Sequence, residues 1–191
     1  MTKIAVVYHS GYGHTGRQAQ AVSEGAATVA GSSAKLYPVN GLDEAQWAEL
    51  DAADAIIFGA PTYMGSASAP FKAFMDESSK RWYGAAWKSK VASGFTTSAS
   101  QSGDKLNTLV QLMVFANQHG MIWVGLDLMP GNNNSKGSVH DLNRLGSFTG
   151  AMAQANADEG ADAMLESDLN TAARLGQRAA EVAGQLARGR S

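Results

Sequence analysis

The chain has 191 residues, of which 45% are hydrophobic, and this suffices for the core of one domain but not of two. Its formal net charge of −2 excludes the strongly basic surface that nucleic-acid binding requires. Cysteine is absent, so disulfides, thiolate nucleophiles and cysteine-ligated metals are excluded, and any redox chemistry needs a bound cofactor.

The N-terminal stretch "MTKIAVVYHS" contains the first predicted strand. Its apolar part, residues 3–8, is a continuous run rich in β-branched residues, which is typical of a strand buried on both faces of a parallel sheet. The run is too short for a signal peptide or a membrane span, so we expect a cytoplasmic protein that does not cross a membrane.

Four further apolar runs predict the other strands. Residues 55–60, "AIIFGA", repeat the pattern of the first run. The weaker candidates, each bounded by turn residues, are residues 34–39, 90–96 and 121–126. Apolar residues at helical spacing predict helices over residues 15–30, 44–53, 69–80 and 104–118. A last, alanine-rich helix is predicted over residues 168–187, with Ser167 as its N-cap.

This alternation predicts an open doubly wound α/β domain over residues 1–191, with a five-stranded parallel sheet between two layers of helices. Two segments exceed such a minimal unit. Residues 127–162 are rich in Gly, Asn and Ala and are longer than a typical connection, which predicts a functional loop or an interface element. Residues 106–117 are apolar almost all round, so we expect either a second subunit or the long loop to cover this helix.

Ligands of open α/β sheets bind beyond the carboxyl ends of the strands, so function is expected at the loops after residues 8, 60 and 96. The first of these loops, "SGYGHT", offers the hydroxyls of Ser10 and Thr15 and a run of backbone N–H groups at the start of a helix. These donors predict a phosphate site that needs no lysine or arginine.

Gly11, Gly13 and Gly16 also satisfy the G-x-G-x-x-G pattern of dinucleotide-binding loops. His9 and Ser10 separate the first glycine from the strand, and no acidic residue ends the second strand, so the pattern lacks both supports of a dinucleotide site. A Walker A loop is excluded because no Gly-Lys-Ser/Thr follows. Taken alone, the loop could also be a glycine-rich turn without a ligand.

The two other loops, "APTYMGSASAP" (60–70) and "TTSASQSGD" (96–104), are rich in small residues and hydroxyls. They let main-chain amides approach a flat heterocycle, while Tyr63, Met64 and Trp82 offer apolar contacts to its faces. Together with one phosphate site, they predict a mononucleotide site for a planar ring, for which flavin mononucleotide (FMN) is the candidate.

Three stretches carry a resemblance to a known family: "YHSGYGHTGRQAQAVSEGA", "AIIFGAPTYMGSASAPFKAFMDES", and "FTTSASQSG" followed by "HGM". They resemble the flavodoxin-like NAD(P)H:quinone oxidoreductases of the WrbA family over about residues 3–125. The resemblance implies the strand order 2-1-3-4-5 and FMN held by all three loops. The cofactor-binding residues that it implies are Ser10, Gly11, Tyr12, Gly13, His14, Thr15, Pro61, Thr62, Tyr63, Met64, Gly65, Thr96, Thr97, Ser98, Ala99, Ser100, Gln101 and Ser102.

The same resemblance implies catalytic roles and an assembly. His119 lies near the FMN ring edge of a neighbouring subunit, with Tyr12 and Trp82 beside the nicotinamide or quinone, and the protein is a homodimer or homotetramer. Other interpretations stay open: His14 only satisfies neighbouring carbonyls, His119 caps a helix C-terminus and complements its dipole, and Trp82 serves packing. The histidines lack metal-ligand spacing and no G-x-S-x-G motif is present, so we expect no metal site and no serine-hydrolase chemistry.

Two functions follow as expectations. In the first, NAD(P)H passes hydride to bound FMN and a quinone-like acceptor takes both electrons, so the protein is an enzyme whose cofactor carries the chemistry. In the second, the protein is an electron-carrier flavodoxin that docks a redox protein. Such carriers usually display a strongly acidic face, and a net charge of −2 provides little of it, so the enzyme is favoured. A receiver domain is excluded because His9 and Ser10 stand where its paired carboxylates would be.

Overall fold

The computed structural model describes residues 1–189. Its strands are β1 (Thr2–Tyr8), β2 (Ser32–Pro38), β3 (Ala55–Tyr63), β4 (Ser66–Ala67), β5 (Val91–Ser98), β6 (Ile122–Trp123) and β7 (Ala151–Gln154). Its helices are α1 (His14–Ala27), α2 (Glu44–Asp51), α3 (Ala69–Glu77), α4 (Ser79–Tyr83), α5 (Lys105–Gln118), the 3-10 helix η1 (Ala161–Ala163) and α6 (Glu166–Gly189).

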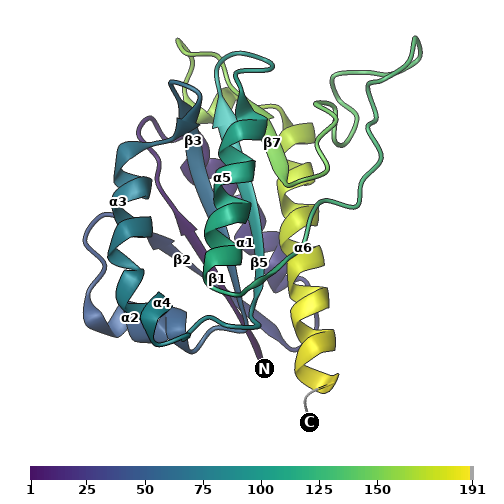
Figure 1. The fold of residues 1–191 in the computed structure, drawn as a ribbon. Helices are drawn as coiled ribbons and strands as arrows, with labels where there is room; N and C mark the ends of the chain where they lie inside the picture. The colour runs from purple at the N-terminus through teal and green to yellow at the C-terminus, as the bar shows by residue number, and fades with distance from the viewer. Residues whose placement is uncertain (190–191) are drawn as a thin grey trace.

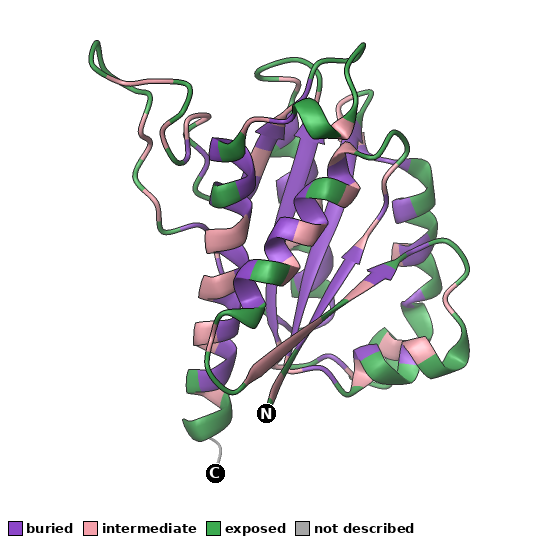
Figure 2. Cartoon of the chain, turned by 180° about the vertical axis from the view of Figure 1, so that it is seen from behind, coloured by how far each residue is buried: buried purple, intermediate pink, exposed green. Residues whose placement is uncertain are grey.

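The sheet confirms the predicted doubly wound arrangement. Its order is β2-β1-β3-β5, all parallel, and both β6 and β7 then pair with β5 in parallel. Alternate residues of each central strand face opposite layers: Ile4 and Val6 contribute to one core cluster, and Ala5 and Val7 to the other. The first cluster lies under α1 and α6, and the second under α2, α3 and α5 (Figure 1). Figure 2 shows the central strands buried between these layers.

The fifth strand position is divided between two short strands. β6 pairs with Val91 and Ala92, whereas β7 pairs with residues 95–98 at the carboxyl end of β5. Residues 124–150 leave the sheet between them, and the N–H of Leu126 donates to the carbonyl of Phe148, so the two ends of this insert bond to each other. The predicted strand over residues 121–126 is therefore wrong beyond Trp123, because its continuation comes from β7.

The insert, residues 124–150, is fixed to α6 by buried polar contacts. Arg144 donates two hydrogen bonds of 2.8 Å to Asp168 of α6, and both side chains are buried. The N–H of Asn143 donates to Thr171 Oγ1 of the same helix. Because α6 begins at Glu166, the prediction that Ser167 is its N-cap is wrong; the Ser167 hydroxyl donates instead to the carbonyl of Val139 in the insert.

Helices α1 and α6 pack with their backbones in direct contact. A Cβ atom on Gly25 would overlap the carbonyl of Ala173, and one on Gly176 would overlap the carbonyl of Val22. Two glycines, one on each helix, thus allow this close approach. They explain how an alanine-rich helix of low side-chain volume buries a continuous face on α1.

We expect Gly176→Ala to lower the free energy of unfolding by about 1–3 kcal/mol, although alanine favours an isolated helix by up to about 1 kcal/mol. The added methyl group meets backbone atoms, which cannot move aside as a flexible side chain would. Urea unfolding measures the change. The control is Gly189→Ala at the end of the same helix, where the new Cβ meets nothing within 4 Å, and equal destabilisation by both variants would contradict the packing argument.

Helix α5 is less buried than its apolar sequence predicts. Its inner side packs on the sheet, but Leu106, Val110 and Val114 form an exposed stripe at a spacing of four residues. The sequence predicts that either the long loop or a second subunit covers this helix. Within residues 1–189 the long loop leaves the stripe exposed. Cover by a second subunit stays a prediction. The helices of the described part of the chain include none long and apolar enough to span a membrane.

Candidate cofactor site

Three predicted loops and one unexpected segment enclose a cavity of about 630 Å³ at the carboxyl ends of β1, β3, β5 and β7. The predicted residues that line it are Gly11, Tyr12, His14, Thr15, Pro61, Thr62, Tyr63, Met64, Gly65, Thr97, Ser98, Ala99 and Ser100. No lysine or arginine of residues 1–189 is among the lining residues. The cavity is therefore lined by small, hydroxyl-bearing and aromatic residues, as a neutral planar ring and one phosphate require.

The first loop presents a helix N-terminus to the cavity. Gly13 has φ 92°, a left-handed conformation that favours glycine, and it turns the chain directly into α1. The N–H groups of His14 and Thr15 in the first turn have no partner within the helix, so they are available to an anion. Gly16 N–H is already satisfied, because it donates to Ser10 Oγ at 3.0 Å.

Two predicted phosphate ligands have other partners here. Ser10 accepts the Gly16 N–H, so its oxygen supports the start of α1, while its proton stays free to donate. His14 lines the cavity, but its Nε2 lies 2.9 Å from the carbonyl oxygen of Glu159 and donates to it. This contact favours the interpretation in which His14 satisfies a neighbouring carbonyl, and it joins the first loop to the segment that follows β7.

The second loop is a β-hairpin that the sequence did not predict. β3 and β4 pair antiparallel, with Tyr63 opposite Ser66, and the two residues between them, Met64 and Gly65, both have positive φ. This is the geometry of a type I′ turn, in which methionine is strained and glycine is not. The Met64 side chain is fully exposed, and Tyr63 meets Tyr12 of the first loop edge to face, with 6.4 Å between ring centroids.

Helix α5 holds the second and third loops in place from below. Thr62 shares hydrogen bonds of 2.8 Å with both Thr96 and Thr108, all three hydroxyls being buried. Asn107 Nδ2 donates to the carbonyl of Gly65, and Gln111 Oε1 accepts from the N–H of Ala67. Thr96 therefore lies beneath the cavity rather than in its wall.

The remaining predicted residues lie outside the cavity wall. Gln101 and Ser102 are exposed and line a neighbouring hollow beside α5, while Ser10 and the exposed Gly13 are not among the residues that line the cavity. The wall also includes residues that sequence reasoning missed: Gly103, Asp104, Ala155 and Ala157. The last two follow β7, whose carboxyl end was not foreseen at this edge of the sheet, and a small apolar side chain carries no signal of its own.

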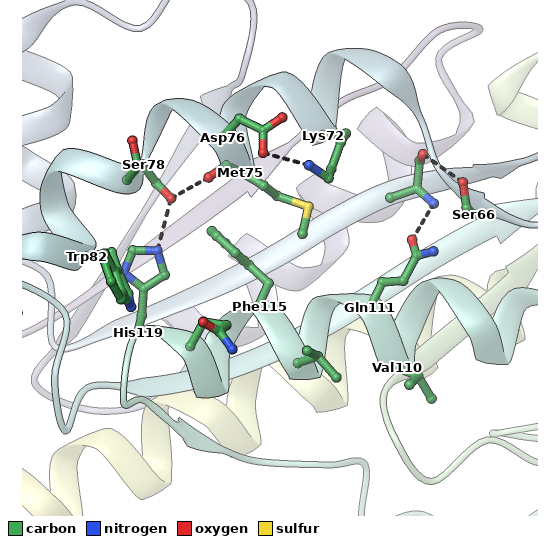
Figure 3. A pocket seen from close by; sticks show the side chains of 14 residues that line it. Ser66, Lys72, Met75, Asp76, Ser78, Trp82, Val110, Gln111, Phe115 and His119 are labelled. Atoms are coloured by element: carbon green, nitrogen blue, oxygen red, sulfur yellow. Dashed lines mark hydrogen bonds and ion pairs between the residues drawn. The ribbon is translucent and has the colours of Figure 1, made fainter.

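His119 and Trp82 lie in a different place from the cavity. Both line a groove of about 700 Å³ between α3–α4 and α5, together with Ser66, Gln111 and other residues (Figure 3). His119 is the C-cap of α5, at the end of the helix remote from the cofactor loops. Within one chain, only Tyr12 of the three predicted catalytic residues lines the cofactor cavity. That His119 and Trp82 reach the site of a neighbouring subunit stays a prediction.

His119 is buried and uncharged. Its Nε2 lies 2.9 Å from Ser78 Oγ, whose own proton goes to the Met75 carbonyl at 2.7 Å, so Nε2 donates and Nδ1 is the unprotonated nitrogen. Nδ1 is buried without a hydrogen-bond partner in the described chain. Burial lowers the pKa of His119 to about 4, against a smaller opposing effect of Asp51. A neutral ring contributes no charge at the helix C-terminus, which excludes the charge–dipole interpretation at neutral pH.

Comparisons with known proteins assign this arrangement to a family. Residues 41–133 match the family model described as NADPH-dependent FMN reductase. The chain is 45% identical to flavodoxin FldP of Pseudomonas aeruginosa, over 97% of this chain and 99% of that protein. It is 32% identical to an NAD(P)H dehydrogenase (quinone) of Aromatoleum aromaticum, over 99% of both. The crystal structure of a WrbA-like flavodoxin from Agrobacterium tumefaciens matches with a TM-score of 0.76 and 45% identity, over 97% and 99% of the chains.

The chain belongs to the WrbA-like flavodoxin family. This membership confirms the predicted fold and indicates FMN as the cofactor. The residues present fit that group on structural grounds: one helix N-terminus offers unpaired amides, and two loops rich in small residues line the same cavity.

Proposed function

We propose that the protein is an FMN-dependent oxidoreductase that passes two electrons from NAD(P)H to a quinone-like acceptor. The observation that carries the proposal is the cavity at the switch point of the sheet, which combines an anion site with a slot for a planar ring. The quinone dehydrogenases among the relatives, at about a third identity over nearly the whole chain, support it. We also propose the cytoplasm as its location and a homodimer or homotetramer as its assembly.

The chain's own residues bind and orient. When bound, FMN supplies the two-electron chemistry. The amides of His14 and Thr15, with the Thr15 hydroxyl, would hold the phosphate at the start of α1. The β3–β4 hairpin and the third loop, which line the same cavity, would hold the ring. Tyr12 lines the cavity and is 81% exposed, and in this proposal it contacts an incoming nicotinamide or quinone.

The second candidate is an electron carrier that docks a redox protein. The name of the Pseudomonas relative, a flavodoxin at 45% identity, favours it. Both candidates need FMN, and they differ in whether NAD(P)H reduces it. A low net charge of −2 provides little of the acidic docking face that such carriers display, which favours the enzyme.

One experiment separates the two candidates. The purified protein is saturated with FMN and mixed with NADH or NADPH in a stopped-flow spectrometer, and benzoquinone is then added. Bleaching of the flavin absorbance within seconds, followed by its return with quinone, is the expected result. Flavin that neither nicotinamide reduces, but that dithionite does, would overturn the enzyme and support the carrier. A protein that binds no FMN at all would refute both.

We expect Thr15→Ala to weaken FMN binding by about 1.5–3 kcal/mol, which is roughly a tenfold to hundredfold higher Kd. Thr15 lines the cavity at the start of α1, where its hydroxyl would donate to a charged phosphate oxygen, and hydrogen bonds to charged groups are the stronger ones. Fluorescence titration of the apoprotein measures Kd. Thr15→Ser, which keeps the hydroxyl, and Thr28→Ala, at the other end of α1, are controls that retain affinity. Unchanged affinity in Thr15→Ala would place the phosphate elsewhere.

A further inference from the structure

Lys105, the first residue of α5, is a buried lysine directly beneath the third cofactor loop. Its Nζ donates three hydrogen bonds of 2.8 Å, to Ser98 Oγ and to the carbonyls of Ser100 and Gln101. Every proton of the ammonium group is thus used, and every acceptor belongs to one loop. Ser98 and Ser100 line the cofactor cavity, so the ammonium group is one hydrogen bond away from its wall.

The charge of Lys105 has no dedicated counter-ion. Its three acceptors are neutral, and Asp168, the acidic group whose charge acts on it, is already paired with Arg144. Asp168 neutralises one of the two positive charges of Lys105 and Arg144, so these three buried side chains carry one net positive charge. Burial lowers the pKa of Lys105 to about 8, partly offset by Asp168, so the group is mostly charged at neutral pH.

Burying the charge of a lysine costs free energy, and a neutral donor could also satisfy the carbonyl groups of the loop. Reduction of FMN by two electrons and one proton adds one negative charge to the ring system. A fixed positive charge beside the cavity wall would favour that product over the oxidised form, because the Lys105 side chain is buried and water screens its charge little. The loop contacts and the charge thus act on two separable properties, the affinity for FMN and its reduction potential.

We propose that Lys105 is a positioning residue with two effects: it fixes the third cofactor loop through its three hydrogen bonds, and its charge raises the reduction potential of bound FMN. The proposal rests on FMN as the cofactor and is independent of whether NAD(P)H or a protein partner supplies the electrons. The two proposals can therefore fail separately. If the quinone reaction is absent, the midpoint potential of bound FMN can still be measured and still tests the role of Lys105.

The test compares Lys105→Met, Lys105→Gln and Lys105→Arg with the unmodified protein. Two quantities are measured: Kd for oxidised FMN by fluorescence titration, and the midpoint potential of bound FMN by equilibration with a reference dye under dithionite or enzymatic reduction. Lys88→Met is the matched control and leaves both quantities unchanged, because Lys88 is exposed and precedes the amino end of β5, whereas the cofactor cavity lies at its carboxyl end.

We expect Lys105→Met and Lys105→Gln to weaken binding of reduced FMN at least tenfold more than binding of oxidised FMN, which lowers the midpoint potential by about 30 mV or more. Lys105→Arg, which keeps the charge, retains the potential even where its affinity falls. An equal loss of affinity for both redox states in the uncharged variants would reduce Lys105 to a structural role and overturn the proposal.

Ser98→Ala provides a second, independent test if the apolar variant does not fold. It removes one acceptor and leaves the ammonium group in place. We expect weaker binding of oxidised FMN with an unchanged potential. A fall in midpoint potential as large as that of Lys105→Gln would show that the potential follows loop geometry and not the charge. If Lys105→Gln does not fold, a fall of about 30 mV or more in Ser98→Ala has the same meaning.

Discussion

Replacing Asp168 by alanine is expected to lower the free energy of unfolding by about 3–5 kcal/mol, the usual cost of breaking a buried ion pair by removing one partner. Arg144 would keep its charge in a site where its side chain is 5% exposed, and the N–H of Gln154, which donates to Asp168 Oδ2, would lose its acceptor. The insert and β7 would both be affected, because this carboxylate bonds to each of them. Urea unfolding followed by circular dichroism measures the loss.

A matched control comes from the surface pair of Lys72 and Asp76, one helical turn apart on α3. We expect Asp76→Ala to cost no more than about 0.5 kcal/mol, because solvent screens an exposed pair. The double variant Arg144→Met with Asp168→Leu recovers most of the loss, since neither charge is left unpaired. A cost below about 1 kcal/mol for Asp168→Ala would mean that Arg144 finds solvent or another acceptor when the insert moves.

Acid is expected to destabilise the protein through His119. The folded state holds this histidine with a pKa of about 4, below its value of 6.5 in an unfolded chain, so the unfolded state binds the proton more readily. Its contribution to stability is complete above pH 6.5 and is lost as the pH falls from 6.5 to 4. At about 1.4 kcal/mol per unit of pKa difference, the loss reaches about 3 kcal/mol by pH 4.

The measurement is the free energy of unfolding between pH 7 and pH 4, compared with that of His119→Phe. A phenylalanine fills the same place between Trp87 and Phe115 and leaves Ser78 bonded to the Met75 carbonyl, so this variant has a flatter pH dependence. His140→Gln, which removes an exposed histidine of the insert, is the matched control. Parallel curves for the parent and His119→Phe would refute the assignment.

The parts of the fold that could be predicted from the sequence are those with local causes. Continuous apolar runs mark β1 and β3 because both faces of a central parallel strand are buried, and the loops after them are recognisable by their glycines and hydroxyls. The divided fifth strand could not be foreseen, because β7 is a four-residue segment, "AMAQ", defined by a pairing with β5 more than fifty residues earlier.

The site shows the same limit. The resemblance and the loop chemistry place most of the cavity wall, but Ala155 and Ala157 enter it only through the pairing of β7. The hairpin at Met64 and the support from Lys105 depend on positive φ angles and on burial, which a single sequence does not reveal. The resemblance implies that His119 reaches the flavin of a neighbouring subunit, and this stays a prediction, because within one chain His119 lies at the end of α5 remote from the cofactor loops.

The insert has a consequence for protein engineering. Its two ends bond to each other beside β5, which is the geometry at which a chain can be shortened or exchanged for a foreign segment with little loop-closure cost. Arg144, however, lies inside the segment that such a graft would discard, and its partner Asp168 lies outside it. A minimised or chimeric version must therefore either carry an arginine back to that position or replace the aspartate in the same step.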